Sequence, residues 1–322
     1  MMTLKYVELA SFKTLKGTDF PVRISYETFG LPIGDAPVVL VNHALTGNST
    51  LLGEHGWWNE IVGDNKLIDT QHYTVISFNI PGNGYDGLLI ENYQDLILAD
   101  VAHMVFQGLK ELNINSLHAA IGGSIGGGLA WELAAAYPSF IKNLIPIATD
   151  WKSSDWVIAN AFLQDQILDN SSSPIHDARL HAMLCYRTPG SFKSRFARST
   201  NEELQIYNVE SWLLHHGKKL QQRFQVGAYK LMNHLLRTID ISKKGDFESV
   251  VAKIESNIYI VSIDTDLFFT DEENRETYLR LSKFKKNIFY KCIRSIHGHD
   301  AFLIEFEQLN QLLKEVFTIN KS

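Results

Sequence analysis

A single serine lies between glycines at the point where an apolar segment gives way to a helix-forming segment. Residues 122–126 read Gly-Gly-Ser-Ile-Gly, with Ser124 at the centre. A sharp turn from strand to helix needs glycines around such a serine, because larger side chains would collide with the neighbouring backbone. The turn exposes the hydroxyl and directs the first helical N–H groups towards a reacting atom. The pattern predicts a nucleophile elbow at Ser124; the alternative is a small residue in an ordinary tight turn.

Two pairs of polar residues later in the chain could activate this serine. A serine hydroxyl needs a base within hydrogen-bond reach and a third group that orients the base. Asp264 and Asp266 follow one late apolar run, and His297 and His299 follow the next. Both pairs are expected at the carboxyl ends of strands, where open α/β sheets gather their sites. The order serine, acid, histidine is that of the α/β hydrolases, but spacing alone leaves the choice within each pair open.

An early loop could supply the second half of an oxyanion hole. Residues 42–48 read Asn-His-Ala-Leu-Thr-Gly-Asn and follow an apolar run. The backbone N–H groups of Leu45 and Ile125 are the expected pair of donors. We interpret His43 as a structural hydrogen-bonding residue, because one base already suffices.

Two other kinds of site fit the sequence less well. His297, His299 and Asp300 could hold a metal, but the other tight histidine cluster is His215 and His216. Adjacent residues on a helix point apart by about 100 degrees, so that pair is a poor chelate, and we expect no metal. The glycines of residues 122–128 do not have the G-x-G-x-x-G spacing of a first strand-helix unit, which argues against a nicotinamide or flavin site.

The elements that must position these residues alternate along the chain. A half-exposed strand is predicted at 22–29, and short apolar runs predict buried strands at 38–41, 74–78, 117–121, 141–148, 258–263 and 288–293. Helical patterns at 96–112 and 129–137 lie between them. From residue 151 the sequence has helical periodicity and few strand-like runs. The sequence predicts an α/β fold with a mostly parallel central sheet, formed by residues 1–150 and 250–322, and a helical cap inserted at residues 151–249.

Composition limits the classes of function. The chain has 322 residues, 45% of them hydrophobic, and its net charge of −6 comes without long charged runs, so we expect neither a nucleic-acid nor a membrane partner. Its two cysteines make a disulfide framework improbable. The first residues lack the apolar core of a signal peptide, and no run of about 18 apolar residues occurs, so we expect a cytoplasmic protein.

Several segments together resemble the homoserine O-acetyltransferase family, the acyltransferases of α/β-hydrolase fold that serve methionine biosynthesis. The matching segments are residues 42–47, 56–58, 122–127, 263–268 and, most specifically, 298–305. The resemblance implies an α/β-hydrolase fold and places the acid on Asp266 and the base on His299. One loop departs from the family pattern: residues 79–87 read Asn-Ile-Pro-Gly-Asn-Gly-Tyr-Asp-Gly instead of a Cys-containing loop that ends in Gly-Ser-Thr-Gly-Pro.

The resemblance also implies how an acceptor would be held. Asp300 would bind the acceptor's amino group, Arg179 its carboxylate, and Tyr186 would lie beside it. An arginine suits a carboxylate because its planar fork donates two parallel hydrogen bonds. The alternative for Arg179 is a solvated cation on a helix face. By the same resemblance, the cap helices form a homodimer contact.

We therefore expect an acyl-CoA-dependent O-acyltransferase that acts on L-homoserine by a ping-pong route through an acyl-Ser124 intermediate. Acetyl-CoA is the expected co-substrate, and no bound cofactor is expected. Three alternatives remain open within the enzyme class: hydrolysis of esters or thioesters by the same triad, O-acylation of L-serine, and use of succinyl-CoA. A binding module without catalysis would need no complete set of serine, acid and histidine.

Overall fold

The computed structural model describes residues 4–9, 12–20 and 22–318. Its centre is an eight-stranded sheet in the order β1-β2-β6-β3-β7-β8-β11-β12, in which β1 and β2 are antiparallel to their neighbours and the other pairings are parallel. The strands are β1 (Lys5–Leu9), β2 (Val22–Gly30), β3 (Val38–Asn42), β6 (Thr74–Phe78), β7 (Leu117–Gly123), β8 (Ile141–Ile147), β11 (Asn257–Ile263) and β12 (Ile288–Ile293). Two short pairs lie outside it: β4 (Val62–Gly63) with β5 (Ile68–Asp69), and β9 (Thr200–Asn201) with β10 (Ile206–Tyr207).

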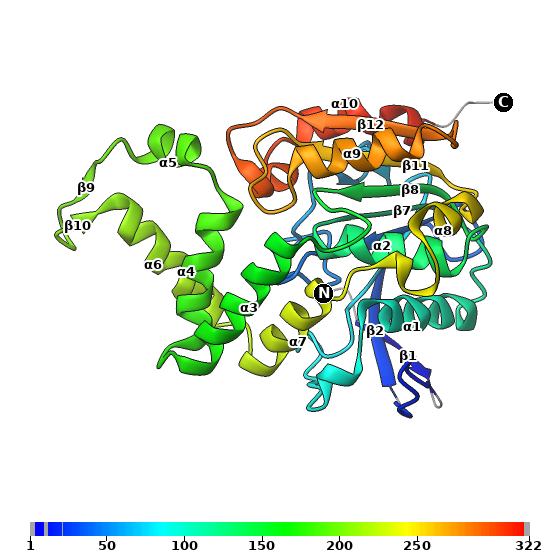
Figure 1. Cartoon of the computed structure of the whole chain (residues 1–322), viewed down its shortest axis with the longest axis horizontal. Coiled ribbons are helices and arrows are strands. Elements are labelled where there is room, and N and C mark those ends of the chain that lie inside the picture. Colours follow the sequence, from blue (N-terminus) through cyan, green and yellow to red (C-terminus); the bar gives the residue numbers. More distant parts are fainter. Residues whose placement is uncertain (1–3, 10–11, 21, 319–322) are drawn as a thin grey trace.

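Helices cover both faces of this sheet (Figure 1). Those packed on it are α1 (Leu98–Glu111), α2 (Ile125–Ala136), α9 (Asp271–Leu281) and α10 (Phe306–Phe317), and α8 (Phe247–Lys253) packs on α2. Side chains alternate along β3: Val38 and Leu40 join the core that contains α1 and α2, whereas Val39 and Val41 join the core that contains α10. The result is the predicted α/β fold with a mostly parallel sheet.

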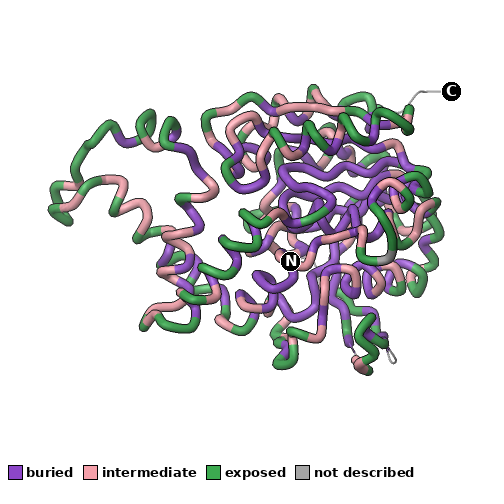
Figure 2. The backbone as a smooth tube through the Cα atoms, in the orientation of Figure 1, coloured by how far each residue is buried: buried purple, intermediate pink, exposed green. Residues whose placement is uncertain are grey.

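Five of the helices between β8 and β11 follow one another directly after β8. They are α3 (Asp155–Asn170), α4 (Pro174–Tyr186), α5 (Pro189–Phe196), α6 (Asn208–Gln221) and α7 (Val226–Arg237). Figure 1 shows them beside the sheet, with α5 and the β9–β10 pair at the far end, and Figure 2 shows that this end is largely exposed. We call α3–α7 the cap. The domain boundaries at residues 150 and 250 stay a prediction. Three 3-10 helices, η1 (Tyr93–Asp95), η2 (Ile241–Lys244) and η3 (Gly298–Leu303), complete the described elements.

One helix begins earlier than its sequence pattern predicts. The pattern suggested a start at residue 129, but α2 begins at Ile125 and includes three consecutive glycines. Glycine is a poor helix former, at a cost of about 1 kcal/mol relative to alanine. Tertiary packing decides the start here, because the beginning of α2 lies directly against the end of β3.

The space at this contact admits only glycine. A Cβ on Gly126 would stand 2.6 Å from the carbonyl oxygen of Asn42 and 2.8 Å from that of His43. A Cβ on Gly122 would stand 2.6 Å from the backbone of Gly126. The Asn42 side chain then donates a hydrogen bond from Nδ2 to the Gly126 carbonyl at 3.0 Å, which ties the strand to the helix.

No described helix is both long and apolar enough to cross a membrane. Cys185 and Cys292 are both free thiols.

Gly126→Ala should destabilise the fold, because the added methyl meets backbone atoms that cannot rotate away. We expect a loss of about 1–3 kcal/mol or more in the free energy of unfolding. Gly227→Ala on α7 is the matched control, since a Cβ there meets no atom within 4 Å. It should be neutral or stabilising by up to about 1 kcal/mol. Urea denaturation of both variants measures the difference, and equal stabilities would contradict the packing argument.

Candidate active site

Ser124 lies in a strained turn between β7 and α2. Its backbone has φ 58° and ψ −129°, a positive φ that side-chain-bearing residues rarely adopt. Such a conformation costs roughly 1–3 kcal/mol and persists only where the surroundings hold it. The Ser124 N–H donates to the Ile147 carbonyl at 2.9 Å, and the Ser124 carbonyl accepts from Gly127 N–H at 2.9 Å. The turn has the geometry of a nucleophile elbow.

Asp266 and His299 form a buried pair from two strand ends. Asp266 follows β11, and His299 lies in η3 after β12. The Asp266 Oδ2 and the His299 Nδ1 are 2.7 Å apart, and both side chains are almost completely buried. A carboxylate on Nδ1 favours the tautomer with its proton there, which leaves Nε2 with a lone pair to accept a proton.

Backbone hydrogen bonds hold the Asp266 carboxylate in place. Its Oδ1 accepts from the N–H groups of Phe268 at 2.7 Å and Phe269 at 3.0 Å. Spacing alone left Asp264 and Asp266 open as the acid, and in the structure Asp266 is the one that lies against His299. The other acid, Asp264, instead accepts from Ser295 N–H at 2.9 Å and pairs with Arg294.

Aromatic rings surround the His299 imidazole. The ring centroids of Phe268, Tyr186, Phe269 and Phe302 lie 5.2, 5.4, 5.9 and 6.0 Å from that of His299. Tyr186 comes from the end of α4 in the cap, and the others come from the core. Rings on several sides keep water away from the imidazole and fix its plane.

Two backbone N–H groups remain open beside the elbow. The Gly47 N–H donates to the Ala44 carbonyl at 2.8 Å, which closes a turn with Leu45 at its second position. Ile125 is the first residue of α2, where helical N–H groups have no partner in their own helix. Within the described residues, neither the Leu45 nor the Ile125 N–H donates a hydrogen bond. Such unpaired donors suit a developing oxyanion.

His43 joins the turn at Leu45 to the loop of residues 79–87. It is fully buried; its Nδ1 donates to the Ala44 carbonyl at 2.8 Å, and its Nε2 accepts from the Ile80 N–H at 3.0 Å. Burial lowers the pKa of His43 from 6.5 to about 4. The imidazole is therefore neutral at ordinary pH, and both of its nitrogens are engaged in holding backbone.

Three further residues predicted from sequence gather near His299. Arg179 lies on α4 with its guanidinium 5.8 Å from the centre of the Tyr186 ring. Asp300 follows His299, and its side chain is 19% exposed. Burial raises the pKa of Asp300, and the Arg179 charge is the largest of the charges that oppose this rise. Among the described residues, Arg179 makes no hydrogen bond or ion pair, so its charge is available to a ligand.

Two arginines at this site were not predicted to belong to it. Arg187 forms an ion pair with Asp300, with 3.7 Å between Nη1 and Oδ2. Arg223, which follows α6, donates from Nη1 to the carbonyl of Thr46 at 2.8 Å, beside Leu45. Both contacts join the cap to the core across long stretches of sequence, which is why local pattern did not reveal them.

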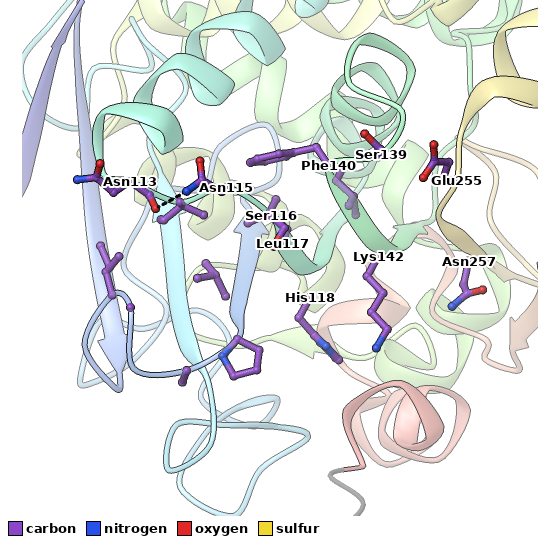
Figure 3. Close-up of a pocket in the computed structure, with 17 residues that line it drawn as sticks. Asn113, Asn115, Ser116, Leu117, His118, Ser139, Phe140, Lys142, Glu255 and Asn257 are labelled. Carbon is purple, nitrogen blue, oxygen red and sulfur yellow. Dashed lines mark hydrogen bonds between the residues drawn. The ribbon is translucent and has the colours of Figure 1, made fainter.

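One large hollow lies away from these residues. It has a volume of about 720 Å³ and is lined by residues at the amino ends of the strands, including Leu117, His118 and Asn257 (Figure 3). Beside the candidate site is a closed cavity of about 10 Å³, lined in part by Leu45, Tyr186 and Phe268. Its size admits about one water molecule. Ser124 and His299 instead belong to the carboxyl edge of the sheet, where α/β folds bind their ligands.

No group of three or more His, Cys, Asp or Glu side chains that could hold a metal ion occurs in the described part of the chain. His297 contacts Arg187 and Ser191 through Nδ1, at 3.0 and 3.1 Å.

Known proteins match this chain over most of its length. A model of the α/β hydrolase fold family matches residues 37–277. The homoserine O-acetyltransferase of Chloroherpeton thalassium is 31% identical over 339 aligned positions, which cover 95% of this chain and 88% of that protein. The homoserine O-acetyltransferase of Methanococcus vannielii is 32% identical, with 95% of this chain and 70% of that protein covered.

Solved structures share the fold. The homoserine O-acetyltransferase from Bacillus anthracis superposes with a TM-score of 0.88 at 19% identity, covering 100% of this chain and 99% of that one. Esterase E22 also superposes with a TM-score of 0.88, at 18% identity, covering 99% of this chain and 100% of that one. At these identities the likeness establishes the fold.

The His43→Leu variant should be less stable than the wild type at pH 7, and this difference in stability should shrink as the pH falls. At pH 7 the variant leaves the Ile80 N–H without an acceptor, at a cost of about 1–3 kcal/mol. The folded-state pKa of His43 is about 4, below its ordinary 6.5, so the unfolded wild type takes up a proton first on acidification. The free energy of unfolding of the wild type therefore falls by up to about 3 kcal/mol between pH 6.5 and 4. The variant lacks this imidazole and does not show that loss.

Urea denaturation of both proteins across this pH range tests the prediction, with the exposed His72→Leu as control. A stability gap that stayed constant with pH for His43→Leu would show that His43 titrates normally.

Proposed function

Because the chain belongs to the homoserine O-acetyltransferase family of α/β-hydrolase-fold proteins, we propose that it transfers an acyl group from an acyl-CoA to the hydroxyl of L-homoserine. The expected acyl group is acetyl. The transfer proceeds in two steps through an ester of Ser124. The acyl-CoA is a co-substrate, and the reaction uses no bound cofactor.

The first step acylates the serine. The Nε2 of His299 takes the proton of the Ser124 hydroxyl as the oxygen attacks the thioester carbonyl, and Asp266 stabilises the imidazolium that forms. The Leu45 and Ile125 N–H groups bind the oxyanion of the tetrahedral intermediate. The carbon–sulfur bond breaks, the CoA thiolate receives the proton from His299, and the acyl-enzyme remains.

The second step delivers the acyl group to the acceptor. Arg179 binds the carboxylate of homoserine through its unpaired guanidinium, Asp300 binds the ammonium group, and Tyr186 lies beside them. His299 removes the proton of the acceptor hydroxyl, whose oxygen attacks the acyl carbonyl. The bond to Ser124 Oγ breaks, His299 returns the proton to the serine, and the O-acyl ester leaves.

One observation carries the choice of an amino acid as acceptor. An unpaired cation, Arg179, and a largely buried carboxylate, Asp300, stand close enough for the charge of one to act on the other, next to His299. A zwitterion needs both charges at a fixed separation. An esterase that uses water needs neither, although it could share the fold and the triad.

The family also supports three wider proposals. The product would serve methionine biosynthesis, the protein would work in the cytoplasm, and two copies would associate through their cap helices. Exposed apolar side chains on the cap, namely Trp156, Phe162 and Leu184, support the last of these.

Purified protein should release CoA from acetyl-CoA faster when L-homoserine is added, and O-acetyl-homoserine should accumulate. Ser124→Ala should lower the rate of transfer by roughly a million-fold, to background, because a triad loses its function with its nucleophile. Thiol release and mass spectrometry of the products measure both. Thiol release that no hydroxy-amino acid accelerates, with free acetate as product, would establish hydrolysis and overturn the proposal.

Arg179→Ala should raise the KM for homoserine by roughly 10- to 100-fold, the value of a lost charge-assisted hydrogen-bonded pair. Acylation of Ser124 should be unchanged, because Arg179 is assigned no role in that step. The control is Lys193→Ala, an exposed cation on α5 of the same cap. An unaltered KM in the Arg179 variant would remove this residue from the acceptor site.

A further inference from the structure

Arg187 is a nearly buried arginine at the junction of the cap and the core. It follows the last residue of α4, and two residues later Pro189 begins α5. Its side chain is only 10% exposed. A guanidinium removed from water is destabilising unless hydrogen bonds and an opposite charge compensate it, so the partners of Arg187 indicate its role.

Three neutral groups orient the guanidinium. Its Nε and Nη2 donate to the Ser191 Oγ at 3.2 and 2.8 Å, and Nη2 lies 3.0 Å from the His297 Nδ1. Its carbon Cζ stands 6.0 Å from the centre of the Trp212 ring. These contacts come from α5, from the loop before η3 and from α6, so the position of the fork is fixed from three sides.

Asp300 is the only acid that pairs with this guanidinium in the described structure. The third nitrogen, Nη1, lies 3.7 Å from Asp300 Oδ2. Arg187 therefore neutralises Asp300 without occupying all of its acceptor capacity. The hydrogen bonds to Ser191 and His297 hold the guanidinium at this distance from the carboxylate.

We propose that Arg187 is a positioning residue that keeps the Asp300 carboxylate ionised and oriented for the ammonium group of the acceptor, and thereby sets how much acyl-enzyme goes to the acceptor rather than to water. This inference rests on the proposed function. It assigns the two neighbouring arginines different roles: Arg179 binds the acceptor, and Arg187 serves Asp300.

The division of roles follows from electrostatics. Burial raises the pKa of Asp300; the charges of Arg179, His299 and Arg187 oppose that rise, and Asp266 adds to it. When the acceptor carboxylate neutralises Arg179, and while His299 is uncharged, Arg187 is the one of these three protein cations that still acts on Asp300, beside the ammonium group of the acceptor itself. A protonated Asp300 would lose its charge attraction for the ammonium group of the acceptor. Water would then hydrolyse a larger share of the acyl-enzyme.

The test compares Arg187→Met and Arg187→Lys with the wild type in the full-length protein. The control is Arg195→Met, since the Arg195 guanidinium lies 5.6 Å from the same Trp212 ring but forms no ion pair within the described residues. Ser191→Ala is a second variant, which loosens the guanidinium without changing any charge. Acylation of Ser124 is followed with p-nitrophenyl acetate, and the partition of the acyl-enzyme is the ratio of O-acetyl-homoserine to acetate formed from acetyl-CoA.

Arg187→Met should raise the KM for homoserine at least about tenfold and shift the partition towards acetate, while the p-nitrophenol burst keeps its amplitude. The acidic limb of kcat/KM for homoserine should move to higher pH, because Asp300 ionises less readily without its cation, whereas that of p-nitrophenyl acetate hydrolysis should stay in place. Arg187→Lys should recover part of the KM, Ser191→Ala should give a smaller effect of the same kind, and Arg195→Met should resemble the wild type.

An Arg187→Met protein with the partition and acidic limb of the wild type would overturn the inference and leave the proposed function standing. Loss of the burst together with transfer would assign Arg187 to folding or to acylation and would also overturn it. A wild type that forms no O-acetyl-homoserine would overturn both the proposed function and this inference.

Discussion

The close approach of β3 to the first turn of α2 is the contact on which the rest of the candidate site depends. Gly126 lies so near the Asn42 carbonyl that no side chain fits between them, and the Asn42 amide bonds the helix in return. This contact helps to hold Ser124 in its strained conformation. It also fixes the end of β3, and with it the turn that carries Leu45, relative to the Ile125 N–H. A single packing constraint thus sets the nucleophile candidate and both candidate oxyanion donors.

The cap supplies the positive charges of the candidate site, and the core positions its histidine and acid. His299 lies among aromatic rings and is paired with one buried acid, and the two arginines that act on the adjacent Asp300, Arg179 and Arg187, both belong to the cap. Because the surroundings are apolar, each charge acts strongly on its neighbours, as the raised pKa of Asp300 illustrates. The hydrogen bond from Arg223 to Thr46 adds a direct link from the cap to the turn at Leu45.

Local pattern predicted seven of the eight strands of the sheet, because these strands are short, apolar and bounded by polar residues; the edge strand β1 was not predicted. The strands β6 and β12 occupy the ranges expected from sequence, and β3 and β7 extend only slightly beyond theirs. The predicted start of α2 was four residues too late, because its glycines become helical only through packing against β3. Spacing could not choose between Asp264 and Asp266, because the choice depends on which carboxylate the Phe268 and Phe269 N–H groups capture.

Contacts made across the fold could not be read from the chain. Arg187 and Arg223 each look like solvated residues near a helix end, and their partners in the core, His297 and Thr46, lie more than a hundred positions away in sequence. The family resemblance supplied Arg179, Tyr186 and Asp300 as residues of one site, which composition and periodicity could not have done. Their roles in binding an acceptor remain proposals, whereas their proximity is a property of the structure.

The anchor between His43 and the loop of residues 79–87 has an evolutionary consequence. Its acceptor is an imidazole nitrogen and its donor is the backbone N–H of residue 80, so the side chain at that position takes no part in the bond. Sequence drift at residue 80 therefore leaves this bond intact, with one exception: proline, which has no N–H to donate. The sequence of this loop can therefore change, as it has here relative to the family pattern, while the hydrogen bond from residue 80 to His43 still holds the loop beside the turn at Leu45.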